Sequence, residues 1–137
     1  MISASWSFPT ALRIAPGCVA ELAATCDLIS VHVPLTSVTR HLVDANFIRN
    51  LAPGAVLINT ARGGVVDEDA VIDALRSRHL GGAAFDVFES EPLDPEAGSR
   101  FDGIPNLLLT PHIAGITDEA NLRVSKVTAE NVLQRLR

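Results

Sequence analysis

Four short apolar runs recur along the chain, and polar segments separate them. Each run is mostly continuous, with little alternation of polar residues, and aliphatic side chains dominate it. Runs of this kind are typical of parallel strands whose two faces are both covered by helices. We therefore predict a parallel sheet with strands at Leu28 to Val33, Ala55 to Ile58, Gly82 to Phe88 and Leu107 to Leu109.

Helices are expected between these strands. Asp44 can cap a short helix that ends at Pro53, and Asp67 can cap a second helix that ends within residues 79–82. The second helix places its apolar residues on one face, at Ala70, Val71, Ala74 and Leu75. The alternation of strand and helix predicts the α/β class, as a partial Rossmann-like doubly wound parallel sheet with flanking helices and right-handed connections.

Three further segments complete the predicted organisation. Thr117 can cap a last helix from about Asp118 to the C-terminus, and its apolar positions drift around the axis, so we expect it to contact two surfaces. The segment Glu91 to Gly103 is predicted to be a loop that is too polar for the core. Near the start, Leu12 to Ala15 fits a short edge strand and Cys18 to Thr25 fits a short helix.

The length and composition are those of an ordinary soluble globular domain. The chain has 137 residues, of which 47% are hydrophobic and 20% are charged, and this is enough to bury a core. We expect one domain over residues 1–137, with the sheet and the candidate motifs in 19–116 and the terminal helix in 117–137.

Charge and cysteine content exclude several classes of partner. The net charge is −5 and no cluster of Lys and Arg occurs, which argues against nucleic acid. No apolar run approaches the ~20 residues that span a bilayer and no signal peptide is visible, so we expect a cytoplasmic protein without a membrane partner. Cys18 and Cys26 are predicted to be reduced core residues, and the four scattered histidines predict no metal site.

Chemically active residues follow the ends of the predicted strands. In an open parallel sheet, ligands bind beyond the carboxyl ends of the strands. The segments at those ends are His32 to Thr36, Asn59 to Gly64, Asp86 to Pro92 and Thr110 to Gly115. We therefore expect an arginine, carboxylates and a histidine to converge on one edge of the sheet.

These residue types suit the interconversion of a 2-oxo acid and a 2-hydroxy acid. The guanidinium of Arg62 can clamp the substrate carboxylate and stabilise charge on the reacting oxygen. The imidazole of His112 can give that oxygen its proton, since its unperturbed pKa is about 6.5. Glu91 can orient the imidazole. Glu89 could reach the same side, but the Glu-Pro setting favours Glu91.

Structural interpretations of the same residues stay open. Arg62 taken alone fits a solvated loop arginine, and His112 taken alone fits a histidine that serves only as a structural hydrogen-bonding group. Asp86 fits a cap at its strand end as well as it fits a ligand contact. His32 fits a packing residue whose backbone borders a ligand better than it fits a catalyst.

Three segments of the chain resemble the signature segments of the D-isomer-specific 2-hydroxyacid dehydrogenases, in family order and at similar spacing. They are Ile58 to Asp67, Ala84 to Pro92 and Leu109 to Gly115. Residues 26–36 resemble the strand and turn that precede these segments, and the resemblance covers roughly Val19 to Arg137. The resemblance implies a partial NAD(P)-binding domain of an oxidoreductase, which transfers hydride between NAD, or NADP, and a small 2-hydroxy or 2-oxo acid and acts as a homodimer.

The resemblance also implies residue roles. Arg62 would bind substrate, Glu91 and His112 would form an acid–base pair, and Asp86 would contact the nicotinamide carboxamide. The implied cofactor-binding set is His32, Pro34, Thr60, Ala61, Arg62, Asp86, His112, Ala114 and Gly115. The start of the last helix, Asp118 to Asn121, resembles members that act on sulfolactate or hydroxypyruvate.

The sequence lacks three features of the family pattern. No GxGxxG loop occurs, since Gly63-Gly64 and Gly81-Gly82 are isolated pairs. The acidic residue that reads the ribose and a separate substrate domain are also missing, so we expect a truncated sequence. A non-catalytic remnant that acts by association with another chain is the alternative, because a truncated sheet exposes a strand edge. A serine hydrolase is disfavoured, since no GxSxG occurs.

Overall fold

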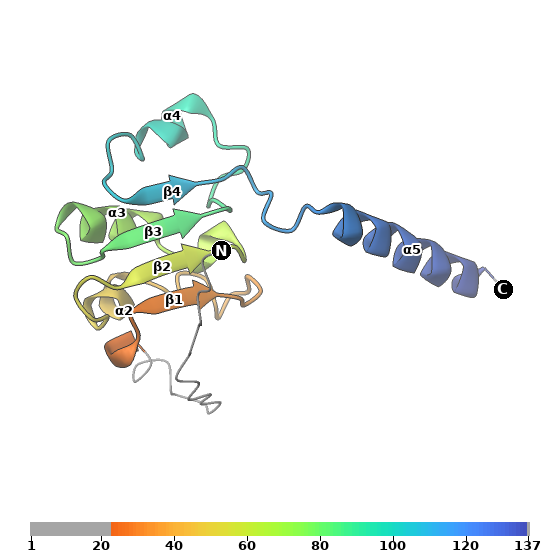
Figure 1. Cartoon of the computed structure of the whole chain (residues 1–137), viewed down its shortest axis with the longest axis horizontal. Helices are drawn as coiled ribbons and strands as arrows, with labels where there is room; N and C mark the ends of the chain where they lie inside the picture. The colour runs from red at the N-terminus through yellow and green to blue at the C-terminus, as the bar shows by residue number, and fades with distance from the viewer. Residues whose placement is uncertain (1–22, 137) are drawn as a thin grey trace, which may run out of the picture.

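A parallel sheet of four strands organises the part of the chain that the structure describes. The computed structural model describes residues 23–136, and Figure 1 shows the strands side by side in sequence order. They are β1 (Leu28–Val31), β2 (Val56–Asn59), β3 (Gly82–Phe85) and β4 (Leu107–Leu109). The predicted α/β class with a partial Rossmann-like parallel sheet is confirmed.

The register of the sheet aligns the strand ends. Val31 pairs with Asn59, Asn59 with Phe85, and Phe85 with Leu109, so the last residues of all four strands form one row. The predicted runs at 28–33 and 82–88 leave the sheet earlier than expected, at Val31 and Phe85. The residues beyond those points form the loops at the carboxyl edge.

Capped helices connect the strands, as predicted. Helix α2 (Ala45–Arg49) begins where the Asp44 side chain accepts a hydrogen bond from the Phe47 N–H at 2.7 Å. Helix α3 (Glu68–Arg76) begins where Asp67 accepts from the Ala70 N–H at 3.1 Å. Both helices end sooner than the glycine and proline signals suggested. A short 3-10 turn, η1 (Gly63–Val65), precedes α3.

The core lies on one face of the sheet. Alternate strand residues such as Leu57 and Phe85 are buried against the apolar face of α3, which includes Val71 and Leu75. On the opposite face, Leu28 and Leu108 of the outer strands are 55% and 62% exposed. The expectation that both faces are covered is therefore wrong for the outer strands within residues 23–136.

The segment 91–103 contains more structure than its polarity suggested. It forms helix α4 (Pro95–Ser99), which Asp94 caps and which Pro95 begins. Phe101 follows the helix and is buried, with its ring centroid 5.8 Å from that of Phe88 and 6.5 Å from that of Phe85. The prediction is therefore wrong for helix α4 and for Phe101, whereas the other residues of 91–103 lie outside the core as expected.

The last helix extends away from the sheet (Figure 1). Helix α5 (Asp118–Arg135) begins as predicted, with Thr117 accepting from the Ala120 N–H at 3.0 Å. Its apolar side chains, including Val124 and Leu133, are exposed. The expected contact with two surfaces is therefore not found within residues 23–136. Among residues 23–136, none of the helices combines the length and the apolar character that a membrane span requires.

Two predictions concern the first part of the chain. The edge strand expected at Leu12 to Ala15 lies outside the described residues, and so does Cys18. Of the helix expected at Cys18 to Thr25, residues 23–25 are described, and they are helical. Cys26 is a free, half-buried cysteine rather than a fully buried one.

Candidate active site

The candidate site is built from loops that leave the carboxyl edge of the sheet. Arg62 lies in the loop after β2, Glu91 in the loop after β3, and His112 in the loop after β4. Because the strand ends are in register, these three loops begin next to one another.

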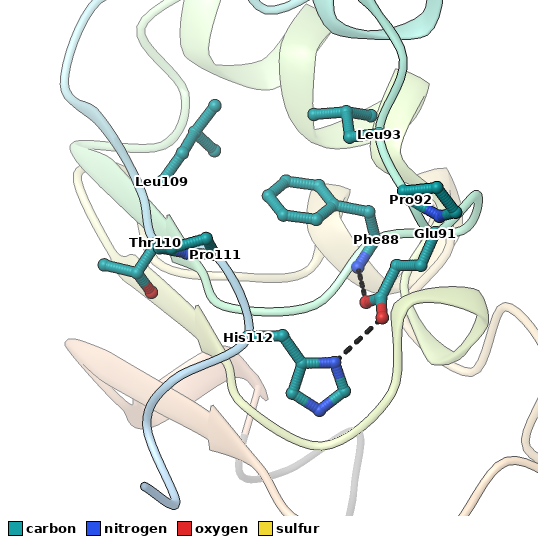
Figure 2. A pocket seen from close by; sticks show the side chains of 8 residues that line it. All are labelled: Phe88, Glu91, Pro92, Leu93, Leu109, Thr110, Pro111 and His112. Atoms are coloured by element: carbon teal, nitrogen blue, oxygen red, sulfur yellow. Dashed lines mark hydrogen bonds and ion pairs between the residues drawn. The ribbon is translucent and has the colours of Figure 1, made fainter.

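Glu91 and His112 form a hydrogen-bonded pair (Figure 2). The Nδ1 atom of His112 lies 2.8 Å from Oε2 of Glu91, and Oε1 of Glu91 accepts from the Phe88 N–H at 2.8 Å. The pKa of Glu91 is held below its usual value of 4.5, first by the Phe88 N–H and then by the hydrogen bond from His112. Burial opposes this effect, and the charges of His112 and Arg62 add to it. Glu91 is thus the ionised partner of the imidazole.

The neighbouring acid, Glu89, has a different partner. Its Oε1 atom lies 2.8 Å from Nε2 of His41, which comes from the loop between β1 and α2. The two glutamates therefore point to different histidines. This arrangement supports the preference for Glu91 over Glu89 as the partner of His112.

Asp86 holds the loop that carries His112. Its side chain is almost fully buried, and Oδ1 accepts from the Thr110 hydroxyl at 2.5 Å and from the Ile113 N–H at 2.9 Å. Oδ2 accepts from the Ala114 N–H at 2.9 Å. Burial raises the pKa of Asp86, but these three hydrogen bonds and the charge of His112 outweigh burial and bring that pKa below 3.8.

These bonds surround a residue with an unusual backbone. His112 has φ +56°, in the left-handed region that residues other than glycine rarely adopt. The hydrogen bonds on both sides of it hold the loop in this conformation and so fix where the His112 side chain leaves the backbone. In the described contacts, Asp86 therefore acts as a cap for this loop.

Arg62 lines a second cavity beside the acid–base pair. That cavity has a volume of about 530 Å³, and its lining includes five of the predicted cofactor-binding residues, namely His32, Pro34, Thr60, Ala61 and Arg62. Glu91 and His112 line another cavity, of about 420 Å³, together with Phe88, Leu93, Leu109 and Pro111. The structure thus brings Glu91 and His112 together and places Arg62 near enough for its charge to affect Glu91.

The remaining predicted cofactor residues are placed differently. Asp86 is buried beneath the loop after β4, while Ala114 and Gly115 are exposed and line neither cavity. Within residues 23–136, no group of three His, Cys, Asp or Glu side chains is arranged to hold a metal ion.

Sequence reasoning missed several residues that position these loops. The Asn59 side chain donates to the Arg62 carbonyl at 3.0 Å and accepts from the Ala61 N–H at 3.1 Å. Gly63 lies so close to the next loop that a Cβ atom there would be 1.9 Å from the carbonyl carbon and oxygen of Phe88. The position of Asn59, a polar residue at the end of a buried strand, could have indicated that its side chain holds the following loop. The close approach at Gly63 left no signal beyond the glycine itself.

Comparison with known proteins places the chain in a family. The family profile described as D-isomer specific 2-hydroxyacid dehydrogenase, NAD binding domain, matches residues 10–114. The chain belongs to this family, as its motifs suggested. The match begins before Val19, where the resemblance was expected to begin, and it ends before α5.

Individual relatives agree with this assignment. The chain is 52% identical over 118 residues to an (S)-sulfolactate dehydrogenase of Chromohalobacter salexigens, and 46% identical over 112 residues to a glyoxylate reductase of Thermofilum pendens. These matches cover 86% and 81% of the chain but 38% and 32% of the two relatives. The chain therefore spans about a third of the length of these relatives.

Solved structures match in the same way. A D-lactate dehydrogenase from Sporolactobacillus matches 87% of this chain with a TM-score of 0.80 and 35% identity, and this chain covers 39% of it. A D-lactate dehydrogenase from Aquifex aeolicus, solved with NAD and lactic acid, matches 86% of this chain with a TM-score of 0.79 and 33% identity, and 39% of its own length is covered.

Proposed function

We propose that this chain supplies the acid–base pair and the substrate-binding arginine of an NAD(P)-dependent D-2-hydroxyacid dehydrogenase. The observation that carries the proposal is the Glu91–His112 hydrogen bond, with the Arg62 charge acting on the same carboxylate. The reaction is hydride transfer between the cofactor and a small 2-hydroxy or 2-oxo acid. Two-thirds of each relative lies outside the match, so the active protein would include further residues.

The imidazole of His112 is the proton donor and acceptor. Glu91 occupies Nδ1, which leaves Nε2 free to face a substrate oxygen, and Figure 2 shows Nε2 directed away from Glu91. The ionised carboxylate of Glu91 holds the ring in this orientation through the Nδ1 contact of 2.8 Å. His112 then donates the Nε2 proton to the alkoxide oxygen in the reduction of a 2-oxo acid, and it removes that proton in the oxidation of a 2-hydroxy acid.

The guanidinium of Arg62 binds the substrate. One of its nitrogens, Nη1, donates to the Ala61 carbonyl at 2.6 Å, and this bond anchors the side chain to its own loop. A guanidinium has five N–H donors, so the others can form a bidentate pair with a carboxylate and stabilise charge on the adjacent oxygen. The nearby charge of Glu91 favours this location for a cation.

The cavity beside Arg62 fits the nicotinamide end of a cofactor. Its volume of about 530 Å³ is within the usual range for ligand sites, about 300 to 1,000 Å³, and the hydroxyl of exposed Thr60 gives it a polar wall. When bound, NAD or NADP supplies or accepts the hydride. His32, Pro34, Thr60 and Ala61 would line it. Asp86, Ala114 and Gly115 would border it less directly, through the loop that carries His112.

The proposal extends to the substrate class, the cofactor and the oligomeric state. The similar proteins are named after sulfolactate, glyoxylate, hydroxypyruvate and glycerate, and each name denotes a small acid with an oxygen function at C2. We propose a substrate of this class, with a sulfolactate-like acid as the first compound to test. Two of the solved relatives contain NADPH and a third contains NAD, so we propose NAD or NADP as the cofactor. The active form would be a homodimer.

A hybrid enzyme tests this function. The matching segment of the Chromohalobacter salexigens (S)-sulfolactate dehydrogenase would be replaced by this chain, which is 52% identical to it. We expect the folded hybrid to reduce the corresponding 2-oxo acid with NADH or NADPH at a rate within about tenfold of the parent. A folded hybrid that binds the cofactor but shows no turnover would contradict the proposal.

A non-catalytic remnant that acts by association is the second candidate function. The exposed Leu28 and Leu108 on the open sheet face, together with the exposed apolar side chains of α5, favour it. Calorimetric titration of the isolated chain with NADH separates the two candidates. No binding at millimolar NADH, combined with self-association in sedimentation experiments, would favour association over independent enzymatic activity.

A further inference from the structure

Three polar side chains are buried within the described residues, and each holds one loop of the candidate site. They are Asn59, Glu68 and Asp86, with 1, 3 and 4% of their surface exposed. Asn59 binds the loop after β2, and Asp86 binds the loop after β4. Glu68 binds the loop after β3 from the first turn of α3, 21 residues earlier in the chain.

The contact of Glu68 is with one peptide unit. Its Oε1 atom accepts from the Glu89 N–H at 2.7 Å. The other side of the peptide between Phe88 and Glu89 lies against Gly63, where a Cβ atom would be 1.9 Å from the Phe88 carbonyl and 2.4 Å from the Glu89 nitrogen. Gly63 and Glu68 therefore fix the plane of this peptide from two directions.

The peptide between Phe88 and Glu89, which Gly63 and Glu68 hold, lies next to the groups that the proposed reaction uses. The N–H of Phe88 donates to Oε1 of Glu91 at 2.8 Å, so the same turn sets the position of that carboxylate. Gly63 directly follows Arg62 in the chain. The distance between the arginine loop and the acid–base pair thus depends on how this peptide is held.

We propose that Glu68 is a positioning residue, which holds the peptide between Phe88 and Glu89 against Gly63 and thereby keeps Glu91 within reach of His112. This inference rests on the proposed function for its catalytic consequence. Its geometric part concerns only the described contacts and can be tested without any turnover.

Stability alone gives a poor reason for a buried acid at this position. Burial raises the pKa of Glu68, against the opposing effects of the Glu89 N–H and the Arg100 charge. The Nη2 atom of Arg100 lies 3.2 Å from Glu68 and 3.2 Å from Asp69. A buried ion pair seldom stabilises a protein more than well-packed apolar residues would. The feature that an apolar side chain could not reproduce is the acceptor for the Glu89 N–H.

Three variants of the chain separate this role from general stability. Glu68→Gln keeps an oxygen that can accept from the Glu89 N–H, whereas Glu68→Met has a similar length and no such acceptor. Asp69→Asn is the matched control, because it weakens the other ion pair of Arg100 and leaves the Glu89 N–H untouched. The readout is the pKa of the Glu91 carboxyl group, followed by carbon-13 NMR during a pH titration of the 137-residue chain.

We expect E68M to raise the pKa of Glu91 to its ordinary value of 4.5, because the turn no longer holds the carboxylate at the Phe88 N–H and His112. The pKa should stay low in E68Q and in D69N. An unchanged, low pKa in folded E68M would overturn the inference. If E68M does not fold, hydrogen exchange of the backbone amides in the unaltered chain provides the test. Exchange of the Glu89 N–H that is about tenfold slower than exchange of the Ser90 N–H supports the inference that Glu68 holds this peptide. Equal exchange rates overturn it.

Turnover of the hybrid enzyme completes the test. A misplacement of about 1 Å can cost ~10²-fold in rate, so E68M should lose kcat by that order with little change in KM, and E68Q should recover most of it. Failure of the proposed function would appear differently. In that case the hybrid would show no turnover with any variant, while the NMR titrations would still distinguish E68M from E68Q.

Discussion

Nδ1 of His112 lies 2.8 Å from Oε2 of Glu91, although the two residues belong to loops that leave different strands. The bond is possible because β3 and β4 are adjacent and in register, which brings their carboxyl ends together. It occupies Nδ1 of His112 and leaves Nε2 free for the proposed contact with a substrate oxygen. The consequences of this relationship can be measured in the chain itself.

The first prediction concerns the ionisation of Glu91. His112→Ala removes a hydrogen bond and a positive charge, so the pKa of Glu91 should rise toward 4.5 and yet remain below it, because the Phe88 N–H still donates to Oε1. Carbon-13 NMR of the carboxyl group during a pH titration measures this change. His41→Ala is the control, since His41 pairs with Glu89. A pKa that is identical in both variants would show that His112 and Glu91 are not bonded in solution.

The second prediction concerns the cap beneath the His112 loop. Asp86→Ala leaves the Thr110 hydroxyl and two N–H groups without an acceptor, and each such loss costs about 1 to 3 kcal/mol. We expect the free energy of unfolding to fall by roughly 3 kcal/mol in urea titrations.

The exposed acid Asp102 supplies the control for this experiment, because Asp102→Ala should change stability by less than about 0.5 kcal/mol. The effect should also depend on pH. The folded pKa of Asp86 is lowered, so its stabilising contribution is present above pH 3.8, the ordinary pKa, and is lost as the pH falls through the folded value. Equal stabilities of the two variants at neutral pH would rule out the cap.

The third prediction compares two glycines. A Cβ atom at Gly63 would lie 1.9 Å from backbone atoms of Phe88, whereas one at Gly115 would meet nothing within 4 Å. Overpacking typically lowers the free energy of unfolding by about 1 to 3 kcal/mol. Because the backbone of Phe88 cannot move aside easily, we expect Gly63→Ala to lower it by about 3 kcal/mol or more. Gly115→Ala should be close to neutral. Urea unfolding measures the stability of both variants. Equal stabilities would refute the close approach of Gly63 to the Phe88 backbone.

The sequence predicted the features that depend on local chemistry. Asp44, Asp67 and Thr117 cap their helices as expected, since a side chain that accepts from an N–H three residues later needs no distant partner. The four apolar runs became the four strands. The motif around His112 placed it beside Glu91, because both residues follow strands that a parallel sheet aligns.

Features that depend on long-range packing could not be predicted. The burial of Phe101 required its contact with Phe88, and the clamp on Glu89 required a carboxylate 21 residues earlier. The exposed faces of β1, β4 and α5 were also missed, because apolar runs predict burial without showing whether the covering element is present. Propensity and spacing describe neighbours in sequence, whereas these contacts join residues that only the fold brings together.

The fourth prediction concerns substrate binding in the hybrid enzyme. Arg62→Ala removes the cation that would pair with the substrate carboxylate and the reacting oxygen, and loss of one such donor costs about 10²- to 10³-fold in rate. We expect kcat/KM to fall by that order, with partial recovery in Arg62→Lys, which keeps the charge without the bidentate geometry. Arg76→Ala changes an exposed arginine on α3 and should have no effect. Equal kcat/KM for the Arg62 and Arg76 variants would contradict the assignment.

The most direct measurement of the central claim is the turnover of a 2-oxo acid by the hybrid enzyme with His112→Ala, compared with His41→Ala. Both histidines are paired with a glutamate at 2.8 Å, but only His112 is proposed to move a proton. Positioned acid–base catalysis is worth about 10²- to 10⁴-fold, so kcat should fall by that order in the His112 variant and stay near the hybrid's own value in the His41 variant. A hybrid that keeps its kcat without the His112 imidazole would contradict the account.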